Sequence, residues 1–213
     1  ELSDVMLARN GRTLISIDDV AVTYSIRELF SQGTSIRLIR IARPRVVVER
    51  EADGRWNLGA LIRRSTRVSQ RSGPGRPIHI RSIEVSDGAV SVLAPVSFGP
   101  AHIPTVYEDL DLNFSLDYQP VAWKASFAHA SFKGKAPDLR INQMSGSISD
   151  NADGWLFDHL LVDTPRSHFV LDGRVDRRTP PVPLPLRIDA ERFAFQEWSG
   201  VLNGLKNIAI GGH

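Results

Sequence analysis

Apolar and polar residues alternate with a period of two through most of this chain, and that alternation constrains its fold more than any other feature. Between residues 108 and 118, for example, Leu110, Leu112, Phe114 and Leu116 all fall on one face of an extended strand. Successive side chains of a β-strand point to opposite faces, so this spacing predicts strands with one apolar and one polar face. The same spacing predicts strands at 14–26, 36–48, 121–132, 138–149, 155–163 and 167–175, and a hairpin at 78–93.

Interruptions of the alternation predict where strands bend or end. The phase shifts at Asp18-Asp19, where we expect a bulge or a turn. Pro44 interrupts the 36–48 segment and favours an edge or bulged position over a central strand. The 78–93 hairpin is expected to turn at Asp87-Gly88, because Asp-Gly is a strong hairpin-turn pair. A proline-rich run at 177–190 is expected to end the sheet with an extended strand.

These elements predict a mainly β protein with two short helices. One helix is capped by Asn57 and ends near residue 64, and the other lies within 193–205, where Phe195, Trp198 and Leu202 recur at helical spacing. Residues 1–64 form a first block of strands with its corner helix, 65–77 a flexible basic loop, and 78–213 a second run of strands ending in the C-terminal helix. A sheet with one apolar face must bury it, so it either folds on itself or leaves a groove for an apolar ligand.

Composition narrows the class of protein. The chain has 213 residues, enough for one large or two small domains, and its 42% hydrophobic and 23% charged content is that of an ordered globular protein. Cysteine is absent, which excludes disulfides, thiolate metal sites and thiol nucleophiles. The sequence has no run of 18 apolar residues and opens without a signal peptide. Since it begins at Glu1 in mid-pattern, we expect it to be a fragment of a longer, anchored chain.

Positive charge gathers in one part of the chain. Between Arg37 and Arg81 there are 12 arginines, no lysine and three acids, although the net charge of the whole chain is only +2. Two interpretations stay open: these arginines form the solvent face of strands and a loop, or they contact an anionic partner. The candidate contacts for anionic lipid headgroups are Arg63, Arg64, Arg67 and Arg71. Nucleic acid is not expected, because only Trp56 and Tyr24 lie near enough to stack on bases.

The residues that carry catalysis or bind metals show no recognisable arrangement. His159 and His168 lie on neighbouring predicted strands near Asp158 and Asp163, but no histidine pair has the spacing of a metal site on a helix. No nucleophile elbow, phosphate-binding glycine loop or dinucleotide fingerprint occurs. Asp109 and Asp111 share one strand face, which leaves a sugar-binding or sugar-cleaving domain as a distant hypothesis. We therefore predict a protein that is not an enzyme and needs no metal or cofactor.

The segment IRLIRIARPRVVVEREADGRWNLGALI, residues 36–62, resembles the signature of the AsmA/TamB superfamily of bacterial envelope proteins. In that family a strand with a proline runs into an acidic-glycine turn, then Trp-Asn-Leu and a short helix. The segment ISIDDVAVTYSIRELFSQGTSIRLI, residues 15–39, resembles the family's lead-in to this motif. SHFVLDGRVD, residues 167–176, resembles its recurrent strand, and RFAFQEWSGVLNGL, residues 192–205, the segment that follows such strands. The resemblance covers about residues 14–205.

What the resemblance implies is an elongated, twisted, largely antiparallel sheet curled into an open groove, apolar inside and polar outside. Such proteins are anchored in the inner membrane, span the periplasm, and are associated with outer-membrane assembly and with phospholipid movement between membranes. Pro44, Gly54, Trp56 and Asn57 would then form a structural corner between strand and helix. The groove wall would comprise Ile39, Ile41, Val46, Val48, Ile83, Val85, Val90, Val92, Leu112, Phe114, Leu116, Phe169 and Leu171.

Two alternatives to a lipid groove stay open at this point. The same apolar residues can form a closed core, in which case no groove exists. A β-rich scaffold or adaptor can also bind a partner protein through an exposed strand edge, without lipid.

Overall fold

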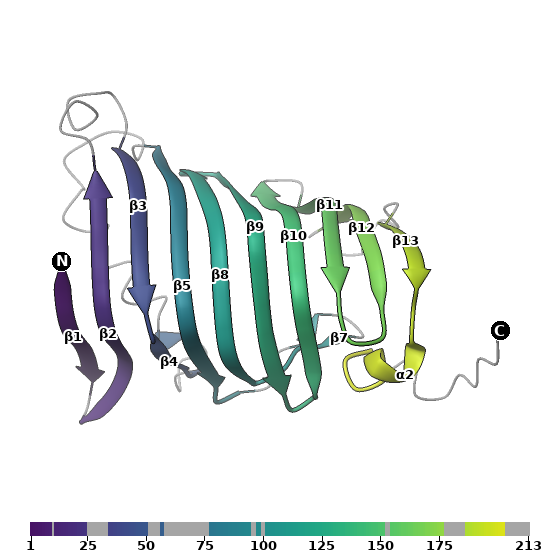
Figure 1. The fold of residues 1–213 in the computed structure, drawn as a ribbon, viewed down its shortest axis with the longest axis horizontal. Coiled ribbons are helices and arrows are strands. Elements are labelled where there is room, and N and C mark those ends of the chain that lie inside the picture. Colours follow the sequence, from purple (N-terminus) through teal and green to yellow (C-terminus); the bar gives the residue numbers. More distant parts are fainter. Residues whose placement is uncertain are drawn as a thin grey trace.

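A single broad β-sheet makes up most of the protein in the computed structural model, which describes residues 1–9, 11–24, 34–50, 56–57, 77–94, 97–98, 101–151, 154–176 and 186–202 (Figure 1). The sheet is 11-stranded, with β4 lying off the main path beside β2 and β5. Its strands are β1 (Leu2–Arg9), β2 (Arg12–Tyr24), β3 (Thr34–Ala42), β4 (Arg45–Val48), β5 (Ile78–Val92), β8 (Val106–Gln119), β9 (Ala122–Lys135), β10 (Leu139–Asn151), β11 (Gly154–Asp163), β12 (His168–Asp176) and β13 (Leu186–Arg192). The longest axis of the molecule runs across these strands, from β1 to β13 (Figure 1).

Most neighbouring strands pair antiparallel, as predicted. The exceptions are β3 and β4, which both pair in parallel with β5. This pairing joins the predicted blocks 1–64 and 78–213 into one sheet. Five predicted strands, at 108–118, 121–132, 138–149, 155–163 and 167–175, appear as β8 to β12, and the final extended strand appears as β13. A small second sheet, β6 (Ser97–Phe98) with β7 (Ala101–His102), and the strand β1 were not predicted.

The breaks in the first block have a structural cause. The phase shift at Asp18-Asp19 lies where β2 changes partner, from β4 at Ile15 and Ser16 to β3 at Asp19. Pro44 lies between β3 and β4, after Arg43 in a left-handed conformation with φ of 48°. The proline therefore separates two strands instead of interrupting a central one.

The predicted hairpin at 78–93 is wrong. Residues Ile78–Val92 form one continuous strand, β5, and Asp87 (φ 51°) makes a bulge within it instead of a turn. Backbone hydrogen bonds from Arg43 N–H to Ser86 O and from Ala89 N–H to Pro44 O, both 2.8 Å, hold the bulge against the break between β3 and β4. A side chain at Gly88 would lie 3.3 Å from both Pro44 Cγ and Leu110 Cβ, so the glycine permits close packing there.

Helix is nearly absent from the described residues. The C-terminal helix is reduced to α2, Phe195–Trp198, after which the chain turns and Leu202 bridges to Ala101 of β7. The other predicted helix lies outside the described residues apart from its first residue, Asn57. No helix in the described ranges is long and apolar enough to cross a membrane.

The two faces of the sheet differ sharply in chemistry. Directly paired residues on neighbouring strands lie on the same face, so the register defines continuous rows. One row runs without a polar residue from β3 to β13: Ile41, Val85, Leu112, Ala130, Met144, Val162, Phe169 and Ala190. The opposite face carries a neighbouring polar row, one position away on each strand except β13, where a register shift makes it two: Arg40, Glu84, Asn113, His129, Gln143, Asp163, His168 and Arg192. We call these the apolar face and the polar face.

A second bulge region lies in the C-terminal half of the sheet. His159 adopts a φ of 48° within β11, and its backbone N–H donates a 2.6 Å hydrogen bond to the Asp172 carboxylate of β12. Gly146 of β10 packs directly against this bulge with φ of 119°. A Cβ at Gly146 would lie 2.3 Å from His159 O and 2.7 Å from Leu160 Cα, so no side chain fits.

We expect Gly146→Ala to lower the free energy of unfolding by about 3 kcal/mol or more, because backbone overlap adds to an unfavourable φ. Gly11→Ala is the matched control: Gly11 also has a positive φ of 75° but nothing within 4 Å of a Cβ. Its cost should be about 1 kcal/mol. Urea unfolding followed by circular dichroism measures both, and equal losses would show that φ alone decides the cost.

Candidate functional site

The apolar face is the largest candidate site in the described structure. The register places all the predicted wall residues on it, since Ile39 pairs with Ile83, Val46 with Val90 and Phe114 with Phe127. Aromatic side chains add to the packing: Phe114 stacks on Phe127 with ring centroids 5.4 Å apart. The period-two spacing therefore predicted which residues share a face, across strands far apart in the sequence.

Exposure of these residues is intermediate. Ile83 and Phe169 are buried, and the other predicted wall residues, from Ile39 to Leu171, are half-buried. Apolar side chains become more exposed toward the margins of the face, where Ile188 on β13 is 51% exposed. Contiguous exposed apolar surface of this kind marks binding sites on many proteins.

Part of the apolar face is covered by the chain itself. The rings of Phe193 and Trp198 pack on Phe169 with centroid separations of 5.5 and 5.4 Å. They also stack on each other, 6.0 Å apart and nearly parallel. We call Phe193 and Trp198 the aromatic cap. Beneath it lies the buried core cluster of the sheet: Ile141, Leu160, Val162 and Phe169. For Phe169 the closed-core interpretation therefore holds.

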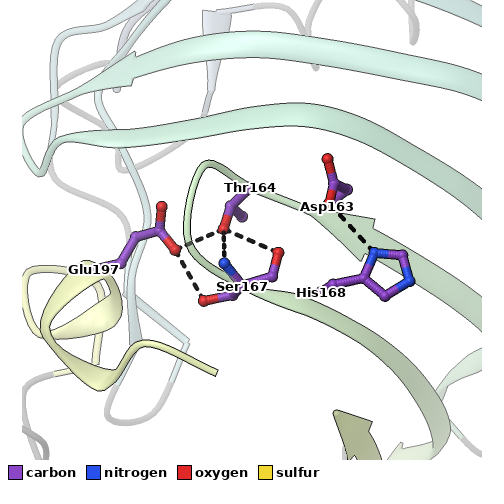
Figure 2. Close-up of polar contacts among 5 residues, drawn as sticks. All are labelled: Asp163, Thr164, Ser167, His168 and Glu197. Atoms are coloured by element: carbon purple, nitrogen blue, oxygen red, sulfur yellow. Dashed lines mark hydrogen bonds and ion pairs between the residues drawn. The ribbon is translucent and has the colours of Figure 1, made fainter. Parts of the chain in front are cut away.

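A buried polar network fastens the aromatic cap to the turn between β11 and β12 (Figure 2). Glu197 of α2 accepts hydrogen bonds from the hydroxyls of Thr164 (2.6 Å) and Ser167 (2.8 Å). The Ser167 hydroxyl oxygen accepts in turn from the Ala194 backbone N–H and from the Trp198 indole N–H, both at 3.1 Å. Ser167 is 0% exposed, so these bonds form away from water. No local sequence pattern indicates this network, because Glu197 lies about thirty residues after Thr164 and Ser167 in the chain.

The predicted structural corner is only partly within the described residues. Asn57 is almost completely buried, and its side chain accepts from Glu49 N–H (3.1 Å) and donates to Val47 O (2.8 Å). Its own N–H donates to Glu49 O at 3.0 Å. Asn57 thus fastens the end of β4, while Trp56 bridges to Arg50. Gly54 and the candidate headgroup arginines Arg63, Arg64, Arg67 and Arg71 lie outside the described residues.

Two described arginines of the first block form exposed ion pairs, which agrees with the solvent-face interpretation for these two residues. Arg40 pairs with Glu84 at 2.8 Å and Arg43 with Asp18 at 2.6 Å, both across neighbouring strands. The hydrogen bond that Arg43 donates to Asp18, and then the charge of Asp18, raise the pKa of the exposed Arg43 guanidinium. Because these pairs are exposed, each contributes little to stability.

Asp109 and Asp111 line a shallow depression of about 410 Å³ on the polar face, together with Lys133 and Arg140. A hydrogen bond from Lys133, and then its charge, hold the pKa of Asp109 below its usual value. The Asp111 carboxylate accepts a 3.0 Å hydrogen bond from the Asp87 N–H, across the bulge. A general acid needs a raised pKa, so Asp109 is unsuited to protonate a glycosidic oxygen.

The histidines considered as metal ligands pair with carboxylates on adjoining strands. His168 lies 3.2 Å from Asp163, and His159 lies 3.9 Å from Asp172. Within the part of the chain that the structure describes, no group of three or more histidine, aspartate or glutamate side chains could hold a metal ion.

Comparison with known proteins gave no relative: no family model, no curated protein and no solved structure matches this chain.

We expect Ser167→Ala to destabilise the protein by about 3 kcal/mol, because it leaves several buried groups of the network without a partner. The aromatic cap should loosen, giving a red shift of tryptophan emission that disappears in a Trp198→Phe background. Ser199→Ala removes only an exposed bond to Gln196 O and serves as the control. Equal stability of the two variants would contradict the assigned role of the network.

Proposed function

We propose that this chain is a segment of a periplasm-spanning AsmA/TamB-like protein whose apolar β-face carries or shields phospholipid acyl chains between the inner and outer membranes. The observation that carries the proposal is the row from Ile41 to Ala190, which crosses eight strands without a polar residue. In this proposal the face curls into an open groove, and the full-length parent is anchored in the inner membrane and supports outer-membrane assembly.

The dimensions of the face suit acyl chains. Neighbouring strands lie about 4.8 Å apart, so eight strands span about 34 Å. One leaflet of a bilayer has a hydrocarbon depth of about 15 Å, so a single lipid covers less than half of that length. Each methylene group removed from water contributes about 0.8 kcal/mol. A continuous apolar surface is therefore sufficient for binding, and a lipid can shift along it without losing contact.

The polar face explains how such a sheet remains in water. Its side chains form ion pairs and hydrogen bonds between strands, such as Lys135 with Glu108 at 2.8 Å and His129 with Gln143 at 2.5 Å. An outward polar face with an inward apolar face is what a lipid-shielding wall requires. No catalytic group is needed for this activity, and the motifs of residues 36–62 support the same assignment.

The edges of the sheet favour a second candidate, a scaffold that binds a partner protein by strand addition. All seven residues of β13 are exposed, and in the described sheet this strand pairs only with β12. Unpaired edge strands can accept a strand from another protein. This function needs no lipid, which separates the two candidates experimentally.

Native mass spectrometry of the purified protein, with lipid extraction of the same sample, tests the lipid proposal. We expect bound phospholipid in the wild type and at least about tenfold lower occupancy in Phe114→Asp, because a carboxylate is costly among acyl chains. Asn113→Asp is the matched control: the adjacent residue faces the polar side, and its change places the same charge there. That variant should keep its lipid.

Folding is checked by circular dichroism, and Leu116→Asp replaces Phe114→Asp if the latter does not fold, because Leu116 lies on the same face nearer the exposed end of β8. Lipid that survives both changes would place the binding surface elsewhere. A wild-type protein that is free of lipid and takes up none on addition would overturn the lipid proposal and leave the scaffold as the better account.

A further inference from the structure

A row of aromatic residues lies at the turn-proximal ends of β8, β9 and β11, on the apolar face. Tyr118 pairs directly with Trp123, and Asp150 of β10 pairs with Trp123 on one side and Trp155 on the other. The two indoles meet with ring centroids 5.4 Å apart and planes at 82°. We call Tyr118, Trp123, Asp150 and Trp155 the aromatic rim.

Asp150 is a charged residue on a face that is otherwise apolar. Among the described positions of β5 and β8–β12 that the register assigns to the apolar face, it is the only aspartate, glutamate, lysine, arginine or histidine. It is half-buried, and its Oδ1 atom is shielded from solvent. Coulomb interactions are stronger where water is excluded, so this carboxylate attracts a nearby cation more strongly than a surface aspartate does.

The chemistry around Asp150 selects one class of ligand. Indole and phenol rings attract cations to their faces, and clusters of aromatic side chains are a recurrent arrangement for binding organic ammonium ions. The phenol of Tyr118 is accessible, since the residue is 41% exposed. An anionic group would be repelled by Asp150, and one carboxylate is too few ligands for a metal ion.

The position of the aromatic rim connects it to the apolar face. The next row inward consists of apolar residues only: Leu116, Ala125, Ile148 and Phe157. A lipid whose acyl chains lie on these residues would have its polar head at the strand ends. Tryptophan and tyrosine favour this boundary between hydrocarbon and polar groups.

We propose that the aromatic rim binds the ammonium group of a zwitterionic phospholipid headgroup, ethanolamine or choline. The inference rests on the proposed function and deepens it, because it names the headgroup class that the apolar face carries. Asp150 supplies the negative charge, and Tyr118, Trp123 and Trp155 supply the aromatic faces.

Competition between headgroups tests this proposal. The protein is incubated with equal amounts of dioleoyl phosphatidylethanolamine, phosphatidylcholine and phosphatidylglycerol, and bound lipids are counted by native mass spectrometry. We expect the two ammonium lipids to exceed phosphatidylglycerol by roughly three- to tenfold in the wild type. Asp150→Asn should abolish that preference while total bound lipid stays the same. Asp138→Asn is the matched control, because it changes the net charge equally at an exposed position at the other end of the hairpin of β9 and β10.

The outcomes separate this proposal from the one on which it rests. If wild-type protein binds lipid without preferring an ammonium headgroup, or if Asp138→Asn acts like Asp150→Asn, the headgroup proposal is overturned and the lipid face stands. If no lipid binds, the lipid proposal fails, and a soluble probe then tests whether the aromatic rim binds an ammonium ion. Tetramethylammonium chloride, compared with sodium chloride at equal ionic strength, should then shift the indole N–H resonances of Trp123 and Trp155 saturably. Unchanged resonances would reject the aromatic rim as an ammonium site.

Discussion

The phase of each strand relative to its neighbours is the constraint on which this structure depends. A slip of one residue moves every later side chain of a strand to the opposite face. The sheet contains breaks and bulges that would cause such a slip if they were not matched across strands. Arg43, Asp87 and Asp109, all with φ near 50°, lie on the neighbouring segments β3–β4, β5 and β8. Because these irregularities occur side by side, β5 and β8 stay paired on the apolar face on both sides of them. Val85 pairs with Leu112 on one side, and Val90 pairs with Tyr107 on the other.

Much of this sheet could be predicted because each strand carries its own alternation. The hairpin turn predicted at Asp87-Gly88 was wrong because a turn and a bulge favour the same residues. Both favour a residue that tolerates positive φ, followed by glycine. Only the partner strands decide between them, and β5 continues because β4 takes over from β3 beside it. The strand β1 was missed because Leu2–Arg9 has no sustained alternation. The parallel pairing of β3 with β5 could not be predicted either, because the alternation within a strand does not show which strand is its neighbour.

The candidate site also has a part that could be predicted from the sequence and a part that could not. Period-two spacing was enough to place Ile39, Ile83 and Phe114 on one face, but it gave no sign that Phe193 and Trp198 would cover Phe169. The network of Thr164, Ser167 and Glu197 and the row through Asp150 each depend on contacts between separate elements. One local signal for the aromatic rim did exist: Trp123, Asp150 and Trp155 each lie within three residues of a chain reversal.

The aromatic cap indicates which part of the apolar face a ligand can use. Over the core cluster, the rings of Phe193 and Trp198 already remove Phe169 from water, and the buried bonds of Ser167 hold them there. An acyl chain would gain little at a surface that is already dehydrated, because the hydrophobic contribution scales with apolar area newly removed from water. Ile39, Ile83 and Phe114 do not belong to the core cluster under the aromatic cap or to the residues that pack against it. Under the proposed function, lipid binding is therefore expected over β3 to β8, with the aromatic cap as its boundary and the aromatic rim along one side.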